Sequence, residues 1–321
     1  MDVCYHAGIY LPEIDLWLDP TTRRERAVVS HAHSDHVRRH GRIIATPDTL
    51  RLIAHRYRRP VCGEAVPWGQ RQEFTSFSLT LLPAGHVRGS AQVLIERRGQ
   101  RLLYSGDLKL SPSHTAEPAE VPGADVLIVE ATFGRPRYRF PPAEEVTRDI
   151  IAFCRTVLAA GGTPVLLAYA LGKAQELMGR LADAGLPLAV HPAAAAVCQL
   201  YEAMGVPLPP YQLLGSDPAP GVVICPPHAR RDPLLIGLRA PRLAFVSGWA
   251  VDPSLRYRMG VDAAFCLSDH ADYDELLEYV RRVGARRIYT VYGFAADLAA
   301  DLRAHGYDAS PLNPPVQDRL L

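Results

Sequence analysis

This sequence contains few lysines and carries almost no net charge. Of its 35 basic residues only Lys109 and Lys173 are lysines, and 34 acidic residues leave a formal net charge of +1. A net charge this close to zero argues against binding to nucleic acid through overall charge, because contacts with phosphates dominate the affinity of proteins for nucleic acid. The local distribution of arginines therefore matters more, and they cluster at residues 23–26, 38–39, 56–59 and 135–139. These clusters either contact a nucleic-acid strand or are solvated side chains of an arginine-rich composition.

Long apolar runs and paired cysteines are also absent. No stretch approaches the roughly 18 apolar residues that cross a membrane. The first residues, with Asp2 and His6, lack the basic-then-apolar pattern of a signal peptide. Six cysteines show no paired spacing, which is typical of buried thiols in a reducing compartment. We therefore expect a cytoplasmic enzyme without membrane contact.

The most informative segment is the hexapeptide His31-Ala32-His33-Ser34-Asp35-His36. It follows a short apolar run at residues 27–29, so it lies where a strand ends in a loop. Imidazole and carboxylate groups suit zinc, manganese or iron. Their spacing puts His31 and His33 on one side and Asp35 and His36 on the other, so the segment predicts ligands for two adjacent metals. A histidine-rich surface loop is the alternative.

Two further donors follow apolar, strand-like runs. His86 ends the run at residues 79–83, and Asp107 ends the run at 101–104. Gly85 and Gly106 come directly before them, and a residue without Cβ lets the backbone approach a crowded site. Considered alone, His86 could equally be an ordinary turn histidine, and Asp107 could equally be a cap at the end of a strand. Together with the hexapeptide they predict a binuclear centre.

This order of motifs resembles the metallo-β-lactamase superfamily of metal-dependent hydrolases. The resemblance implies an α/β fold, an αββα sandwich, with two divalent ions, zinc or manganese, that activate a water. It implies that His31, His33 and His86 hold the first metal, that Asp35 and His36 hold the second, that Asp107 bridges them, and that Asp19 supports the site without binding metal.

Two later segments resemble the β-CASP branch of that superfamily, whose members are nucleic-acid-processing nucleases. The apolar run at 125–129 ends in Glu130, and the segment 265–272 contains His270. The resemblance implies that Glu130 orients His270, which protonates the leaving oxygen, so that both join Asp35 as catalytic residues. An imidazolium near a carboxylate does keep its proton near neutral pH. The alternative is that His270 is only a first-turn residue of a helix at 273–283.

The third β-CASP motif departs from the family pattern. RNA-cleaving members typically carry His there and the DNA-specific eukaryotic ones Val, whereas this chain places Tyr292 in the slot, or Val291 if the register shifts by one residue. Phenol, with a pKa near 10, is a poor ligand at neutral pH. We therefore expect weaker binding of the second metal and a modest preference for DNA.

Further residues are candidates for substrate contact. Gly172 and Lys173 follow an apolar run and open a predicted helix, whose free N–H groups suit phosphate. An ordinary turn with a solvated lysine is the alternative. The complete set of expected substrate contacts is Gly172, Lys173, Arg135, Arg137, Trp249 and Tyr292.

The pattern of the chain changes near Pro141. Short strand-like runs precede it, and after it predicted helices alternate with apolar runs, a βα rhythm typical of a parallel sheet. The helices are predicted at 144–160, 173–184 and 192–204, and the strands at 164–168, 187–190 and 221–225. By the resemblance, residues 1–137 begin the metallo-β-lactamase domain, 138–261 form an inserted α/β β-CASP domain, and 262–321 complete the first domain.

The segments Ser247-Gly248-Trp249 and 267–273 further resemble the bacterial DNA-ligase-associated exonucleases of this branch, and the likeness runs from about Asp19 to Gly293. It implies a DNA exonuclease of repair that hydrolyses phosphodiesters of single-stranded or end-containing duplex DNA, in company with a ligase, a helicase and a phosphoesterase. Two alternatives remain: an RNA endo- or exonuclease of the same architecture, and a small-molecule thioester hydrolase.

Overall fold

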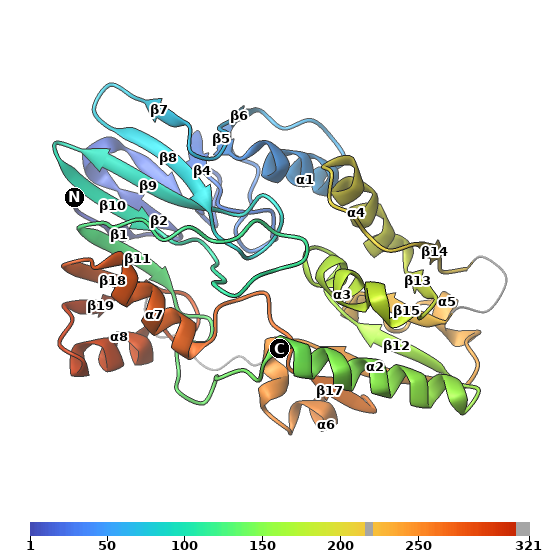
Figure 1. Ribbon diagram of the computed structural model, residues 1–321. Coiled ribbons are helices and arrows are strands. Elements are labelled where there is room, and N and C mark those ends of the chain that lie inside the picture. Colours follow the sequence, from blue (N-terminus) through green and yellow to red (C-terminus); the bar gives the residue numbers. More distant parts are fainter. Residues whose placement is uncertain (216–220, 313–321) are drawn as a thin grey trace. The chain divides into compact units, whose positions relative to one another are not determined.

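The structure is a computed structural model that describes residues 1–215 and 221–312 (Figure 1). Contacts within the chain divide it into two units. The first unit joins Met1–Tyr138 with the chain from His270 onward, and the second runs from Arg139 to Asp269. No helix in the described ranges is both long and apolar enough to cross a membrane.

Two sheets form the first unit. The first sheet has the order β1-β2-β3-β4-β5-β6, and the second has the order β19-β18-β11-β10-β9-β8-β7. Strands of the first sheet are β1 (Cys4–Tyr5), β2 (Ile9–Leu11), β3 (Leu16–Leu18), β4 (Arg26–Val28), β5 (Arg42–Ala45) and β6 (Gly63–Ala65). Those of the second are β7 (Arg71–Glu73), β8 (Ser78–Pro83), β9 (Ala91–Arg97), β10 (Gln100–Tyr104), β11 (Val126–Glu130), β18 (Arg287–Val291) and β19 (Ala309–Pro311).

Side chains alternate along these strands between two apolar cores. Leu102 and Tyr104 of β10 pack with residues of the first sheet, such as Ile9, so one core lies between the sheets. Leu103, between them in sequence, packs instead with a cluster that includes Leu276. This alternation has the two-residue period of a strand that is buried on both faces.

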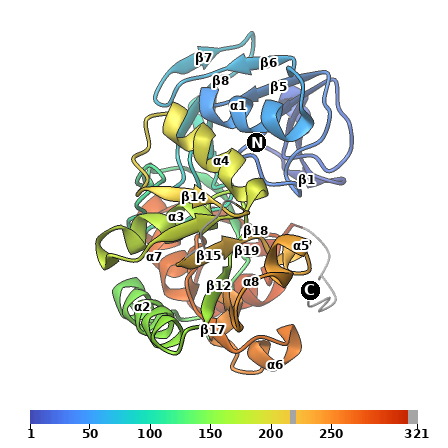
Figure 2. The same ribbon diagram turned by 90° about the vertical axis from the view of Figure 1, so that its right-hand side faces the viewer.

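Helices cover the outer faces of the two sheets. In the first unit α7 (Tyr273–Val283) and α8 (Ala295–Ala304) pack on the second sheet, beside β11, β18 and β19 (Figure 1). On the other side α1 (Pro47–Tyr57) lies against β5 and β6 (Figure 2). The layers are helix, sheet, sheet and helix, so the αββα sandwich expected from the sequence is confirmed.

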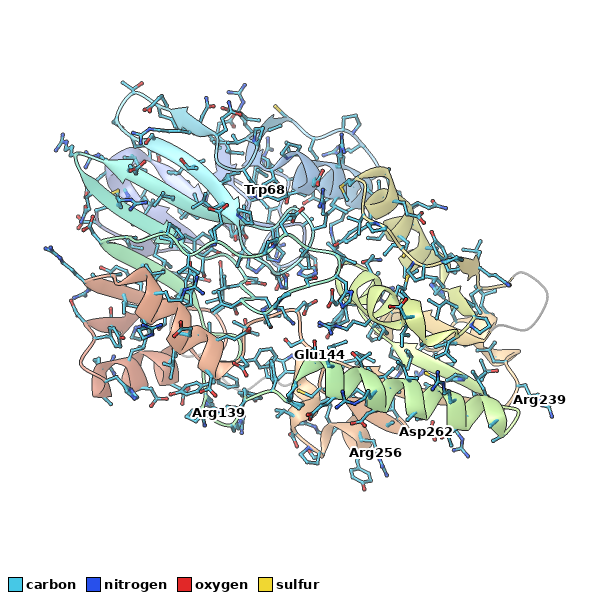
Figure 3. The ribbon with its side chains drawn as sticks, viewed as in Figure 1. Trp68, Arg139, Glu144, Arg239, Arg256 and Asp262 are labelled. Carbon is cyan, nitrogen blue, oxygen red and sulfur yellow. The ribbon has the colours of Figure 1, made fainter. Side chains whose placement is uncertain are left out.

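The second unit is a parallel sheet in the order β14-β13-β15-β12-β16-β17. Its strands are β12 (Thr163–Leu167), β13 (Leu188–Val190), β14 (Tyr211–Leu213), β15 (Val222–Cys225), β16 (Pro241–Val246) and β17 (Ala263–Phe265). One face carries α2 (Ala143–Ala159), α3 (Lys173–Leu181) and α4 (Pro192–Ala203), and the other carries α5 (Pro233–Ile236) and α6 (Leu255–Met259). Glu144, near the start of α2 (Figure 3), pairs with Arg180 of α3 at 3.8 Å.

The second unit runs past the boundary at residue 261 that the sequence predicts, because β17 pairs with β16 and keeps residues 263–265 in the parallel sheet. Its start, Arg139, lies one residue after the predicted start of the insert. The end of the predicted third segment, residues 313–321, lies outside the described residues. Assignment of the units to the two named domains stays a prediction.

Candidate metal centre

Carboxyl ends of several strands carry the predicted site residues of the first unit. His31 follows β4, His86 follows β8, Asp107 follows β10 and Glu130 is the last residue of β11. β8 and β10 are both antiparallel to β9, so they point the same way, and β10 and β11 are parallel. Their carboxyl ends therefore meet at one edge of the sheet, which brings together residues that are far apart in the chain.

Two glycines allow the approach that this edge requires. Gly85 has φ +79°, and a Cβ there would lie 2.0 Å from the carbonyl oxygen of Lys109. Gly106 has φ +56°, and a Cβ there would lie 2.9 Å from the carbonyl oxygen of Ala91. Both the backbone conformation and the space exclude a side chain. The sequence-based reason for these glycines, close approach of the backbone, is confirmed.

One group of donor atoms converges from His31, His33, His86 and Asp107. The Nδ1 atom of His33 lies 3.1 Å from Nε2 of His31 and 3.0 Å from Nε2 of His86. Asp107 Oδ2 lies 3.4 Å from the first of these Nε2 atoms and 3.7 Å from the second. Ligands of a tetrahedral zinc ion at 2.0–2.1 Å are about 3.3–3.4 Å from each other. The four atoms therefore have the chemistry and spacing of one metal site.

A second group of donors lies on the other side of Asp107. Its Oδ1 atom is 3.5 Å from Nε2 of His36, and Asp35 Oδ2 lies 3.9 Å from that same nitrogen. The two oxygens of Asp107 thus face different histidine groups. This is the arrangement in which one carboxylate can bridge two cations.

Asp19 is 1% exposed and contacts the imidazoles of His36 and, through Ser30, His31 on the side away from their Nε2 atoms. Its Oδ2 accepts hydrogen bonds from His36 Nδ1 at 2.8 Å and from Ser30 Oγ at 2.5 Å. The Ser30 hydroxyl in turn lies 3.0 Å from Nδ1 of His31. With Nδ1 engaged in this way, the Nε2 lone pairs of both histidines are left for a cation. Asp19 also accepts from the Ser30 N–H at 2.7 Å and from the Tyr104 hydroxyl at 2.7 Å.

The electrostatics of these buried side chains also fit a cation. Burial lowers the pKa of His31 well below its ordinary value, and neighbouring histidines add to this effect. Burial raises the pKa of Asp107 to about 7. Burial opposes protonation of His36, but Asp107 and Asp19 outweigh it and raise its pKa to about 10. Without a metal these buried groups compete for protons, whereas a divalent cation would be matched by neutral imidazoles and charged carboxylates.

Glu130 and His270 form a pair beside this centre. Glu130 is fully buried, and its Oε1 lies 3.2 Å from Nδ1 of His270. Its two oxygens also accept the N–H groups of Leu108 at 2.7 Å and Thr132 at 3.2 Å. Burial acts to raise the pKa of Glu130, but the charge of His270 and these hydrogen bonds lower it below its ordinary value. The other ring nitrogen of His270, Nε2, lies 3.9 Å from Asp107 Oδ2 and so faces the metal donors.

Tyr292, and not Val291, lies at the centre. Val291 is fully buried in the core between the sheets. The Tyr292 ring packs edge-on to His36 with centroids 5.1 Å apart, and its hydroxyl lies 3.1 Å from that of Tyr104. Burial and then the charge of Asp19 raise the pKa of Tyr292 well above its ordinary value. The phenol therefore stays protonated at neutral pH and does not offer the anionic oxygen that a cation would favour.

Comparison with known proteins gives the family of this chain. A family profile described as "Beta-lactamase superfamily domain" matches residues 18–167. A "Probable DNA ligase" from Opitutus terrae is 43% identical over 312 residues, which cover 96% of this chain and 31% of that protein. The chain belongs to the metallo-β-lactamase superfamily, in its β-CASP nuclease branch.

Other relatives within this superfamily bear the names of RNA-cleaving enzymes. An "RNase J-like protein" from Methanocaldococcus jannaschii is 29% identical over 183 residues, 48% of this chain and 42% of the relative. "Endoribonuclease YSH1" from Kluyveromyces lactis is 36% identical over 117 residues, 36% of this chain and 15% of the relative. The chain spans less than half the length of each of these relatives, and about a third of the Opitutus protein.

Two arginines expected to contact substrate, Arg135 and Arg137, lie in the first unit of this metallo-β-lactamase superfamily member. Arg135 pairs with Asp297 at 3.2 Å, and its guanidinium lies 4.0 Å from the centroid of the Phe294 ring. Arg137 is exposed and donates to the Tyr138 hydroxyl at 2.8 Å. Both arginines thus have partners within the protein, and Arg137 is in addition open to solvent. Their contact with substrate stays a prediction.

The remaining expected contacts belong to the second unit. Gly172 precedes α3, and its N–H donates to the side chain of Gln175 at 2.8 Å. Lys173 is 1% exposed and its ammonium pairs with Asp269 at 2.8 Å, so the solvated lysine of the alternative is excluded. Trp249 is half-buried, and its backbone N–H donates to Ser247 Oγ at 3.4 Å. Their roles toward substrate stay predictions.

Sequence reasoning missed two residues of this centre, Ser30 and Tyr104. Ser30 directly precedes His31, and Tyr104 is the last residue of β10, three before Asp107. Their positions beside the ligands were the available signal. What the sequence does not reveal is that both donate to Asp19, because Asp19 and Tyr104 are separated by 85 positions.

Proposed function

We propose that this chain is a metal-dependent phosphodiesterase, and specifically a DNA exonuclease that acts in repair with two bound divalent ions, zinc or manganese. One observation carries the proposal: the two oxygens of Asp107 face separate imidazole groups, and a histidine paired to a buried carboxylate lies beside them. A binuclear centre with an adjacent proton donor suits phosphodiester hydrolysis, because it can activate water and protonate the leaving oxygen.

Each group has a role in this proposal. His31, His33, His86 and Asp107 would hold one ion, and Asp35, His36 and Asp107 the other. Divalent ions held by these residues would supply Lewis-acid activation of water and would neutralise charge on the phosphate. Glu130 accepts a hydrogen bond from the Nδ1–H of His270 and so fixes the orientation of the ring. The His270 imidazolium then donates its Nε2 proton to the departing sugar oxygen and becomes a neutral imidazole.

The preference for DNA over RNA depends on two points. A relative that matches 96% of this chain is named a probable DNA ligase, which supports a role on DNA. Tyr292 stands where RNA-cleaving members are expected to offer an imidazole, and its phenol remains protonated. Against this, several relatives bear RNA nuclease names, so RNA cleavage by the same groups is the second candidate function.

A direct test compares matched single-stranded and duplex DNA and RNA, labelled at either end, with zinc and with manganese. Stepwise removal of terminal nucleotides from DNA, with RNA left intact, would support the proposal. Cleavage of RNA alone would favour the second candidate. Turnover of an acyl-glutathione with no nucleic-acid cleavage would instead identify a thioester hydrolase. His33→Ala serves as the metal-site control, since His33 contributes the nitrogen at the centre of the first donor group.

We also propose a cytoplasmic location and association with a DNA ligase, a helicase and a phosphoesterase. The cysteines support a reducing compartment, because none of the described thiols is in a disulfide. The Opitutus relative supports the ligase, since its name is that of a ligase and the match covers a third of its length. Co-purification of the tagged protein from its own cells would test these partners.

A further inference from the structure

A pocket of about 460 Å³ lies in the first unit next to the histidine loop. A volume of this size is in the range of sites for small ligands or for one part of a larger ligand. Its lining includes Ser34 of the loop, Tyr57 at the end of α1, and the arginines Arg23, Arg38, Arg39 and Arg56. None of these residues has a place in the chemistry proposed above.

Positive charge in this pocket is not balanced by the protein. In the described ranges no carboxylate lies within 4.0 Å of the four guanidinium groups. Neighbouring arginines of the same unit behave differently: Arg42 pairs with Glu64 at 3.7 Å, and Arg88 with Asp48 at 2.8 Å. With a formal net charge of only +1 for the whole chain, such a cluster is a strong local excess. Gathered arginines without counter-charges favour an anion that accepts several N–H donors.

Two of the arginines are tied to the loop that carries the metal donors. Arg38 donates to the carbonyl oxygen of Ser34 at 2.5 Å and, through Nε, to that of Thr21 at 2.9 Å. Arg56 donates to the carbonyl oxygen of Ala32 at 3.2 Å. Ser34 is flanked by His33 and Asp35, whose Cα atoms are each about 3.8 Å from its own. An anion in the pocket would therefore lie next to the metal centre.

The N–H donors of the other two arginines are accessible to a ligand. Arg23 and Arg39 are exposed, and Arg39 lies over the Tyr57 ring at 5.2 Å. A guanidinium has five N–H groups and can hold a phosphate in a forked geometry. The Tyr57 ring adds an aromatic side chain. Proteins that bind single-stranded nucleic acid combine such side chains with basic groups.

We propose that this arginine pocket binds a backbone phosphate of the nucleic-acid strand, one that is not itself cleaved. The inference rests on the proposed function and extends it, because residues of the first unit would then contact a second phosphate of the strand in addition to the scissile one. The metal centre alone would then suffice for a small diester, while a longer strand would gain affinity by reaching the pocket.

The test uses the double variant Arg23→Gln/Arg39→Gln, which leaves the loop-binding Arg38 and Arg56 in place. Its matched control is Arg42→Gln/Arg51→Gln, which removes the same charge from the same unit outside the pocket. Two substrates are compared, a single-stranded DNA oligonucleotide and bis(p-nitrophenyl) phosphate, which is too short to span both sites. The quantity of interest is the ratio of kcat/KM for the oligonucleotide to that for the small diester.

We expect this ratio to fall about tenfold or more in the pocket variant, through a higher KM for the oligonucleotide. The slope of log KM against log salt should become shallower by about 0.7 for each phosphate that the variant no longer binds. The control should keep its ratio within about twofold of the unsubstituted protein. Equal ratios in the pocket variant and the control would overturn the inference.

A binding measurement separates this inference from the proposed function. Fluorescence anisotropy of a labelled oligonucleotide in EDTA reports the pocket without turnover. If no diester is cleaved with any metal but the pocket variant still binds more weakly than the control, the proposed activity fails and the pocket stands. If both variants bind like the unsubstituted protein, or none binds at all, the pocket assignment is wrong.

Discussion

Replacement of Asp19 by Asn tests how the metal centre is held. Asp19 accepts four hydrogen bonds and is almost fully buried: three donors meet Oδ2, and the Ser30 N–H meets Oδ1. Asn keeps one carbonyl oxygen and presents an NH₂ group in place of the other. It is also tolerated at φ 44°, the left-handed conformation that Asp19 adopts, so the backbone adds no strain.

The size of the effect follows from the geometry. The better orientation of Asn places its oxygen at the position of Oδ2, which keeps three hydrogen bonds and turns the NH₂ group toward the Ser30 N–H. One buried backbone donor then has no acceptor, which costs about 1–3 kcal/mol in the free energy of unfolding. Removal of the negative charge also weakens the hold on His36 and, through Ser30, on His31.

Two assays check this prediction. In urea unfolding of the metal-free protein we expect a decrease of about 2 kcal/mol in the free energy of unfolding. In competition with a chelating dye we expect metal affinity to fall about 10–100-fold, because groups behind the ligands have effects of this size. Asp15→Asn is the matched control, since Asp15 also has a left-handed φ, 47°, but is exposed and accepts a hydrogen bond from Tyr10.

The outcome that refutes the reasoning is a metal affinity equal to that of the Asp15→Asn control. Asp19 would then be a structural buried carboxylate without influence on the imidazoles. A decrease in stability alone, with unchanged affinity, would have the same meaning for the metal centre.

Three further predictions concern other groups. His270→Ala should lower turnover about 10²–10⁴-fold with metal content unchanged; release of a metal ion in this variant, seen by elemental analysis, would show that His270 is a ligand. Tyr292→His should raise affinity for the second metal by about tenfold or more, because an imidazole replaces a protonated phenol; a metal titration that matches the unsubstituted protein would contradict this. Burial lowers the pKa of His40 to about 4, and the charges of Arg24 and Arg38 add to the effect. The unfolded chain therefore takes up a proton below about pH 6.5 that the folded protein does not, and stability falls as the pH drops from 6.5 toward 4. After allowance for partial exposure, His40→Asn should remove about 1 kcal/mol of the stability decrease seen by urea unfolding between pH 7.5 and 5, and an unchanged decrease would count against it.

Local regularities of the sequence predicted much of the second unit. The helices expected at 144–160 and 192–204 are α2 and α4, each within a residue of the expected bounds, and the strand expected at 187–190 is β13. These elements are encoded by apolar spacing over a few residues, which requires no knowledge of distant parts of the chain. The helix expected at 173–184 ends as α3 at Leu181 and continues as a short 3₁₀ turn to Ala184.

In the first unit the same reasoning placed the strands that precede the site residues, β4, β8, β10 and β11, but among other elements it did not predict helix α1. Its sequence follows the histidine loop and mixes arginines with few apolar residues, of which Leu52 and Ile53 are buried. Only packing on β5 and β6 gives those two side chains a core to enter. Arg56, in its last turn, then lines the pocket beside the loop, a feature that the spacing of charges alone did not reveal.

The amino-acid sequence by itself determined which donors are available and that His31, His86 and Asp107 each follow a strand, because ligand chemistry and strand periodicity are properties of short segments. Only the tertiary structure decided which atom of each donor faces which neighbour. The division of Asp107 between His31 and His36, the support of Asp19 by Tyr104, and the choice of Tyr292 over Val291 all depend on strand pairing and register. Register relates residues that are far apart in the chain, and it is set by burial of two whole sheets against each other, which no local pattern contains.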